Sequence, residues 1–208
     1  MFADRTDAGR RLADLLVDRG VTADIVLAVP RGGLPVARPV ADRLDAPLDV
    51  IAAKKLGSPW NPELAVGAVA SDGAVWVNAD LVEDLGISEA YLDEETGRQH
   101  AVAAEKTETY REGKPPLDLD GLTAVVVDDG VATGATTIAC IRGAREAGAE
   151  RVVLAVPVGP PDTVERLRAE ADEVVCLLIP PQFHAVGQFY ESFTQVSDEE
   201  AMSYLDGN

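Results

Sequence analysis

The stretch VVVDDGVATGATT at residues 125–137 decides the fold of this chain and points to its chemistry. It starts inside a continuous apolar run at 124–127, which is typical of a strand covered on both faces of a parallel sheet. Asp128 and Asp129 follow at the carboxyl end of that strand, where open α/β sheets bind their ligands. A glycine-containing turn comes next, and then a helix expected over 138–147. Backbone N–H groups and hydroxyls can converge there on a phosphate, so the stretch predicts an anion and ribose site.

The same stretch closely resembles the phosphoribosyl diphosphate (PRPP) signature of the type I phosphoribosyltransferases. In that family two acids hold the ribose 2- and 3-hydroxyls, and the next loop surrounds the 5-phosphate. Ionised carboxylates only accept hydrogen bonds, and each ribose hydroxyl has one to donate. The resemblance implies that Asp128 and Asp129 bind ribose and a Mg2+ ion. It implies further PRPP contacts at Gly130 and Val131, and a phosphate loop made of Ala132, Thr133, Gly134, Ala135, Thr136 and Thr137.

Two other interpretations of this stretch compete with that one. An ordinary strand, Asp-Gly turn and capped helix would also contain a DDG sequence, although the whole ordered string is far less common. A P-loop nucleotide-binding site is disfavoured, because no lysine follows a glycine in the GxxxxGK[ST] arrangement.

A second candidate loop, PRGG at 30–33, follows an apolar strand predicted at 25–29 and precedes a helix predicted over 34–44. Glycines let the backbone approach a ligand closely, and a forked arginine cation suits a diphosphate. In the resembled family this is the pyrophosphate loop, which implies that Arg31, Gly32 and Gly33 bind PRPP. A tight turn with a surface arginine is the alternative.

Two lysines, Lys54 and Lys55, follow the strand predicted over 48–53, in a chain with only four lysines. They resemble the Arg-Lys pair that many family members place before a mobile catalytic loop. The resemblance implies that both bind PRPP and that Lys55 also acts in catalysis. Lys54 stands where the family usually has arginine, and lysine cannot make the bidentate contacts of a guanidinium.

The residues after this pair, SPWNPELAVGAVA at 58–70, begin with turn formers and become apolar. They fit a flexible lid that closes over substrate, joined to a hairpin with strands at 64–70 and 74–77. A plain hairpin without a lid is the equal alternative. Glu63 in the lid is the candidate for handling the acceptor's proton, and an exposed loop carboxylate is its alternative.

Strands predicted at 151–156 and 174–179, with a helix opening near 161, continue the alternation of strand and helix. This predicts an α/β fold, a single Rossmann-like domain with a mainly parallel central sheet flanked by helices. The domain is expected to cover 1–208, with a core at about 20–180. A lid, hairpin and long-helix insertion is expected at about 54–115, and a hood at about 180–208.

Two helices outside this alternation are predicted from their caps. Thr6 or Asp7 can cap a helix that runs through Leu16. Ser88 can cap a long polar helix to about Arg111, which is expected to be a surface or interface element because it has few large apolar residues.

The predicted hood contains most of the chain's Phe and Tyr residues. In the resembled family a variable hood stacks the acceptor base, which makes Phe183 and His184 the acceptor-binding candidates. The alternative is that the aromatic rings form the hood's own small core and that the histidine is structural. Ala132 stands where family members acting on 6-oxopurines commonly have aspartate, which looks more like the adenine or orotate enzymes. The acceptor base is not identified.

Thirty-six acidic residues against eighteen basic ones produce a formal net charge of -18. The charges are spread along the chain, so an acidic surface that repels nucleic acid is expected. Our hypothesis is adaptation to a high-salt cytoplasm, with an acidic mesophile as the milder alternative. At about 1 M salt the Debye length is about 3 Å, so local cations and Mg2+ would decide the binding of anionic PRPP.

No apolar run approaches the roughly 18 residues that span a bilayer, and the first residues lack a signal peptide's hydrophobic region. A cytoplasmic protein without membrane contact is therefore expected. Cys140 and Cys176 are expected to be buried, reduced thiols, since no CxxC pair or histidine cluster accompanies them.

The resemblance implies an enzyme that transfers the 5-phosphoribosyl group from PRPP to a nitrogenous base and releases pyrophosphate. Its expected partners are PRPP and a base, and a homodimer is left open. The alternative is a regulator on the same fold that senses PRPP or a nucleotide without turnover.

Overall fold

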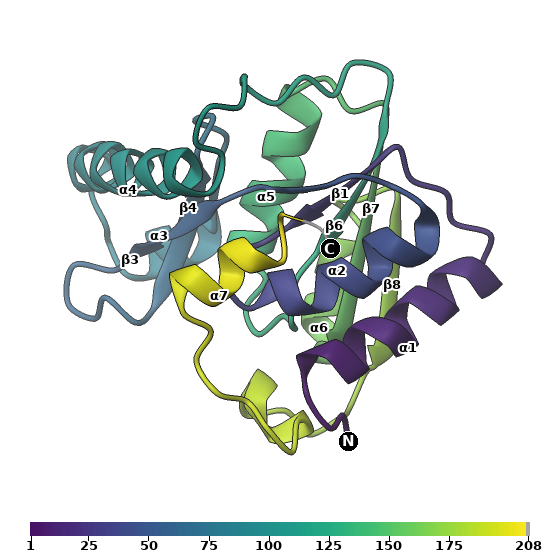
Figure 1. Ribbon diagram of the computed structural model, residues 1–208. Helices are drawn as coiled ribbons and strands as arrows, with labels where there is room; N and C mark the ends of the chain where they lie inside the picture. Colours follow the sequence, from purple (N-terminus) through teal and green to yellow (C-terminus); the bar gives the residue numbers. More distant parts are fainter. Residues whose placement is uncertain (207–208) are drawn as a thin grey trace.

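The computed structural model describes residues 1–206 and contains two sheets, of which the larger has five parallel strands (Figure 1). Every neighbouring pair in the larger sheet is parallel, which confirms the predicted α/β fold with a mainly parallel central sheet flanked by helices. In spatial order its strands are β2 (Leu48–Val50), β1 (Ile25–Ala28), β6 (Thr123–Val127), β7 (Arg151–Val158) and β8 (Glu173–Leu178).

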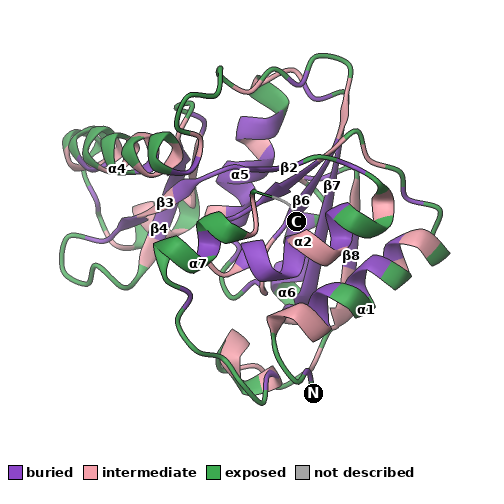
Figure 2. Ribbon diagram, viewed as in Figure 1, coloured by how far each residue is buried: buried purple, intermediate pink, exposed green. Residues whose placement is uncertain are grey.

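Helices cover both faces of this sheet, because alternate residues of each strand point to opposite sides. On one face, Val125 and Val127 of β6 pack in a core with helices α1 (Arg5–Asp18) and α2 (Gly33–Leu44). On the other face, Val126 packs beneath α5 (Ala135–Glu146) and α6 (Pro161–Leu167). Figure 2 shows the strands buried between these layers.

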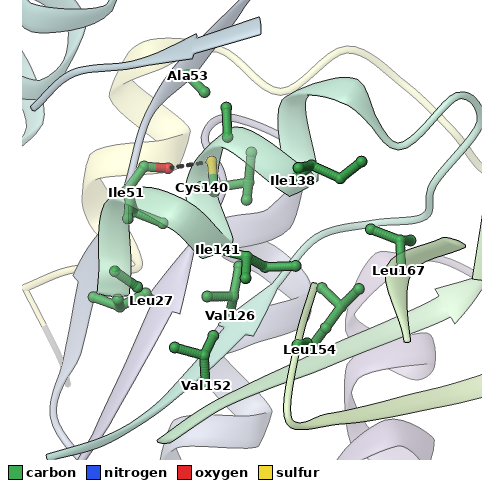
Figure 3. Close-up of a cluster of buried hydrophobic side chains, with 14 of the residues drawn as sticks. Leu27, Ile51, Ala53, Val126, Ile138, Cys140, Ile141, Val152, Leu154 and Leu167 are labelled. Atoms are coloured by element: carbon green, nitrogen blue, oxygen red, sulfur yellow. Dashed lines mark hydrogen bonds between the residues drawn. The ribbon is translucent and has the colours of Figure 1, made fainter. Parts of the chain in front are cut away.

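The cysteine prediction is confirmed in its main point, since both thiols are free. Cys140 lies on α5 within the core, and its thiol donates to the Ile51 carbonyl at 3.6 Å (Figure 3). Burial raises the pKa of the Cys140 thiol. Cys176 is half-buried in β8. The deeply buried thiol therefore acts as a small packing residue.

The predicted strand over 48–53 is wrong in its extent. The strand β2 ends at Val50, and the chain then enters an antiparallel sheet made of β3 (Ala53–Gly57), β4 (Ala65–Ala70) and β5 (Val75–Val77). Lys54 and Lys55 therefore lie inside β3 and not after a strand end. Nothing in the sequence of residues 48–53 indicates this change from one sheet to the other. The hairpin between β4 and β5 is present, as predicted.

Two helices follow the antiparallel sheet: α3 (Ala79–Asp84), which was not predicted, and α4 (Glu89–Tyr110). Ser88 caps α4 as expected, since its side chain accepts from the Tyr91 N–H at 3.3 Å. Only Glu95, Ala103 and Tyr110 of α4 are buried, and half of its residues are exposed (Figure 2), in agreement with the predicted surface element. Within residues 1–206 no helix is both long and apolar enough to cross a membrane.

The predicted start of two other helices needs correction. Asp4 caps α1 in place of Thr6 or Asp7, because its carboxylate accepts from the Asp7 N–H at 2.8 Å. The helix after the phosphate loop begins at Ala135 and not at 138, because Gly134 takes the left-handed conformation just before it. The C-terminal part contains the short 3-10 helix η1 (Val186–Phe189) and α7 (Asp198–Ser203).

Candidate functional site

The two glycine-containing loops predicted from separate parts of the sequence lie against each other. They follow the adjacent strands β1 and β6, and the Val29 N–H donates to the Val127 carbonyl at 2.9 Å. A Cβ atom on Gly32 would lie 2.0 Å from Asp129 Oδ2, and one on Gly33 would lie 2.7 Å from the Val127 carbonyl oxygen. Only glycine allows this approach. The Pro30-Arg31 peptide bond in the same loop is cis.

The two adjacent carboxylates stand at the carboxyl end of β6, as predicted. Asp128 Oδ1 accepts from the Asp129 N–H at 2.8 Å. Burial raises the pKa of Asp128, and the neighbouring charge of Asp129 raises it further. Burial also raises the pKa of Asp129, against the opposing effect of Arg5. The pair is therefore an energetically costly arrangement of like charges, which is common at functional sites.

Arg5 at the start of α1 holds Asp129 from the other side of the site. Its Nε donates to Asp129 Oδ2 at 2.8 Å, and its Nη1 donates to the Thr194 carbonyl at 2.7 Å. The guanidinium lies 3.8 Å above the centre of the Phe193 ring, and 11% of the Arg5 side chain is exposed. The Tyr190 hydroxyl donates to the Asp129 carbonyl at 2.6 Å. The sequence interpretation missed Arg5 and Tyr190, since neither has a local motif.

The predicted phosphate loop leads into the N-terminus of α5, where unpaired backbone N–H groups favour an anion. Gly134 has a φ of 76° and precedes the helix. Thr163 of α6 supports the loop by donating its hydroxyl to the Ala132 carbonyl at 2.7 Å. Ala132 and Thr133 are exposed at the loop surface, and Thr136 is half-buried. The buried members of the predicted set are Gly130, Val131, Gly134, Ala135 and Thr137.

The Val131 N–H is already used, since it donates to the Val158 carbonyl at 2.9 Å. Val131 therefore anchors the loop to β7, and the exposed residues after it present the free surface of the loop.

A cleft of about 300 Å³ lies beside the PRGG loop. Arg31 and Lys54 line it together with Lys106 of α4, whose Nζ donates to the Pro30 carbonyl at 2.7 Å. Burial lowers the pKa of Lys106, and the charges of Lys54 and Arg31 lower it further. Lys106 was not predicted, because nothing in the local sequence distinguishes it from a surface lysine.

Asp198 of α7 also lines this cleft. Its carboxylate lies 3.3 Å from Arg31 Nη1 and also accepts a hydrogen bond from the Tyr110 hydroxyl. The hydrogen bond from Tyr110 and the charge of Arg31 both lower the pKa of Asp198. A carboxylate is therefore already seated against one of the cations of the cleft.

Lys54 and Lys55 point to opposite faces of β3, because successive strand residues alternate. Lys54 lines the cationic cleft, whereas Lys55 Nζ pairs with Glu63 Oε2 at 2.8 Å. The Glu63 side chain is 87% exposed. The two residues predicted to act in catalysis thus contact each other, and neither lines the cleft.

The acceptor candidates lie in the aromatic C-terminal segment. The Phe183 ring stacks on Phe189, with ring centroids 5.5 Å apart. His184 is exposed, and its backbone N–H donates to Gln188 Oε1 at 3.0 Å. Tyr190 packs against both Phe2 and Phe193. Several of these rings therefore contact each other, as a small local core would require.

The donor set for a metal ion is limited to the acidic pair. Within residues 1–206 no group of three or more His, Cys, Asp or Glu side chains converges. Mg2+ usually keeps several waters and binds one or two carboxylates together with substrate phosphates. Asp128 and Asp129 fit this mode, in which the substrate completes the coordination.

The chain is similar in sequence and structure to several known proteins. The model of the family described as "Phosphoribosyl transferase domain" matches residues 4–193. Two Mycobacterium tuberculosis proteins, provisionally named as phosphoribosyl transferases, are each 48% identical to the chain over 206 residues. These matches cover 99% of this chain and 46% of theirs, so the chain spans about half the length of these relatives.

The crystal structure of TT1426 from Thermus thermophilus is similar over nearly its whole length. It is 43% identical in sequence with a TM-score of 0.83, and the match covers 99% of this chain and 97% of that chain. AQ2163 from Aquifex aeolicus is 12% identical with a TM-score of 0.54, covering 98% and 86% of the two chains, and shares the fold.

Proposed function

Because the chain belongs to the phosphoribosyl transferase domain family, we propose that it transfers the 5-phosphoribosyl group of PRPP to a nitrogen of a base and releases pyrophosphate. One observation supports this most strongly. The PRGG loop and the acidic pair, which are about a hundred residues apart in the sequence, approach so closely that Gly32 has no room for a side chain beside Asp129. Such contact would let one ligand touch both loops.

Each part of PRPP has a matching group in this proposal. Asp128 and Asp129 accept hydrogen bonds from the ribose hydroxyls, and these bonds are stronger when the carboxylates are ionised. The loop at 132–137 and the N-terminus of α5 hold the 5-phosphate through backbone N–H groups. Arg31, Lys54 and the glycines of the PRGG loop receive the diphosphate.

The reaction is a displacement at the anomeric carbon. A base nitrogen forms a bond to that carbon while the carbon–oxygen bond to pyrophosphate breaks, and the bonding electrons leave with pyrophosphate. Positive charge develops on the ribose near the acidic pair, and the cleft cations neutralise the leaving group. Mg2+, when bound by Asp128 and Asp129 together with PRPP oxygens, would add to this neutralisation. The protein must also position the acceptor base and exclude water from the site.

Phe183 and His184 remain proposed contacts for the base, and Glu63 remains the proposed proton acceptor with Lys55 beside it. Glu63 would need to move with its loop, because it is exposed and paired with Lys55. A flexible lid would supply that movement. The proposed setting is a salt-rich cytoplasm, with a homodimer as the proposed assembly.

The second candidate function is a sensor that binds PRPP or a nucleotide without turnover. It is favoured by the internal pairing of two proposed ligand contacts, since Asp129 pairs with Arg5 and Arg31 pairs with Asp198. A ligand has to compete with these partners, so its arrival could change the position of α1 or α7.

The test is Mg2+-dependent release of pyrophosphate from PRPP with a panel of purine, pyrimidine and related bases, at low and molar KCl. Release that requires one base would establish the transferase and identify its acceptor. The D128N/D129N double variant is the matched negative control. PRPP binding without release for any base would favour the sensor. Absence of PRPP binding would refute the transferase and a PRPP sensor, and would leave only a sensor of nucleotides.

A further inference from the structure

The cleft beside the PRGG loop gathers cations from three separate elements of a strongly acidic chain. Arg31 follows β1, Lys54 lies in β3 and Lys106 lies in α4. Two of the four lysines in the sequence therefore meet in one cleft, although the chain has a net charge of -18. Placing like charges together costs energy, and a bound anion would offset that cost.

Lys106 has donors left for such an anion. An ammonium group has three N–H donors, and the Pro30 carbonyl uses one of them at 2.7 Å. Among residues 1–206, neither Lys106 nor Lys54 has a carboxylate oxygen within the 4.0 Å limit of an ion pair. Burial lowers the pKa of Lys106, and the positive charges of Lys54 and Arg31 lower it further.

Arg31, the third cation of the cleft, already contacts a carboxylate. Arg31 contacts the Asp198 carboxylate, which is 60% exposed and comes from the short helix α7. Tyr110 donates to the same carboxylate. Glu105 is the other acidic residue of the lining. The Asp198 carboxylate thus already contacts Arg31, whereas within residues 1–206 no carboxylate forms an ion pair with Lys54 or Lys106.

We propose that Lys106 is a diphosphate-binding residue, and that α4 contributes it to the site alongside Arg31 and Lys54. The proposal rests on the proposed function and deepens it. The Lys106 ammonium keeps its bond to the PRGG loop through Pro30 and directs its other donors to the diphosphate. Diphosphate binding is in this way coupled to the position of α4, an element outside the two sequence motifs.

Binding measurements on the full chain test this by comparing pyrophosphate with ribose 5-phosphate, which lacks the diphosphate. Lys106→Met is expected to weaken pyrophosphate binding by roughly ten- to a hundred-fold, as for the loss of a charge-assisted hydrogen bond. Ribose 5-phosphate should bind as before, and Lys106→Arg should recover part of the loss. Lys114→Met is the matched control, because Lys114 is a 44% exposed lysine just beyond the same helix.

The possible results separate the two proposals. Unchanged pyrophosphate binding in Lys106→Met would overturn the role of Lys106 and leave the proposed function standing. Equal loss of both ligands would also overturn it, because Lys106 would then only support the loop. If the unmodified protein bound ribose 5-phosphate but not pyrophosphate, the diphosphate site itself would be refuted. Binding of neither ligand would refute the proposed function and this inference together.

Discussion

Arg5 Nε lies 2.8 Å from Asp129 Oδ2, so the first helix is tied to a carboxylate 124 residues further along the chain. Both side chains are largely buried, with 11% and 15% exposed. The acidic pair is therefore held by the fold as a whole and not only by its own loop.

Removal of Arg5 should destabilise the protein, because Asp129 would lose its buried countercharge. Arg5→Ala is expected to lower the free energy of unfolding by about 2 to 4 kcal/mol, measured by urea denaturation. Arg43→Ala is the control, since Arg43 forms an exposed pair with Asp14 and should change stability by less than about 1 kcal/mol. Equal effects of the two variants would contradict the importance of the Arg5–Asp129 pair.

The raised pKa of Asp128 has a consequence for stability. A carboxyl group with a higher pKa in the folded state than its ordinary 3.8 favours folding when protonated, and this contribution is lost as pH rises from 3.8 through the folded-state value. Asp128→Asn should therefore raise the free energy of unfolding near pH 7 by roughly 0.5 to 2 kcal/mol. The gain should shrink as pH falls toward about 4. A gain that grows on acidification would contradict this account.

Asp129→Asn should weaken PRPP binding, because the ribose would lose a charge-assisted hydrogen bond. The expected loss is about 1.5 to 3 kcal/mol, measured by titration calorimetry. Asp14→Asn removes an acid whose side chain is 71% exposed and should leave the affinity unchanged. Normal affinity in Asp129→Asn would remove the ribose assignment. Thr133→Val offers a similar test of the phosphate loop, since normal binding by that variant would place the phosphate elsewhere.

Gly32→Ala should disturb the acidic pair, because its Cβ would lie 2.0 Å from Asp129 Oδ2. PRPP binding should fall by at least about tenfold, which corresponds to about 1.4 kcal/mol. Gly97→Ala is the control, since outside the backbone of its own helix no heavy atom lies within 4 Å of the added Cβ, and alanine favours a helix by about 1 kcal/mol. That variant should be slightly more stable and bind normally. If Gly32→Ala binds PRPP as well as Gly97→Ala, the two loops do not share a ligand.

The proposed salt adaptation predicts that stability rises with KCl. Screening of a net charge of -18 should raise the thermal midpoint between low and molar KCl. A midpoint that falls over this range would exclude the halophilic interpretation. It would leave the proposed chemistry untouched, because the cations of the cleft act locally.

Local sequence predicted the strands β1 and β6 with the loop after each, and most of β7 and β8. Buried parallel strands need continuous apolar runs, and the turns after them need glycine. Both features can therefore be recognised from a few consecutive residues. The break between β2 and β3 could not be found in this way, because 48–53 is apolar throughout except for Asp49. The change of sheet depends on which strand each half pairs with.

The alternating α/β architecture and the two motif loops follow from local sequence, since periodicity and turn chemistry act over a few residues. The distant side chains that complete the site are brought together by the packing of the fold. Arg5 and Lys106 come from helices whose local sequence carries no signal of a ligand. The structure also separated Lys54 from Lys55 by the alternation of β3 and its packing beside α4. Contacts between residues a hundred positions apart arise from the packing of whole elements, which a local pattern does not specify.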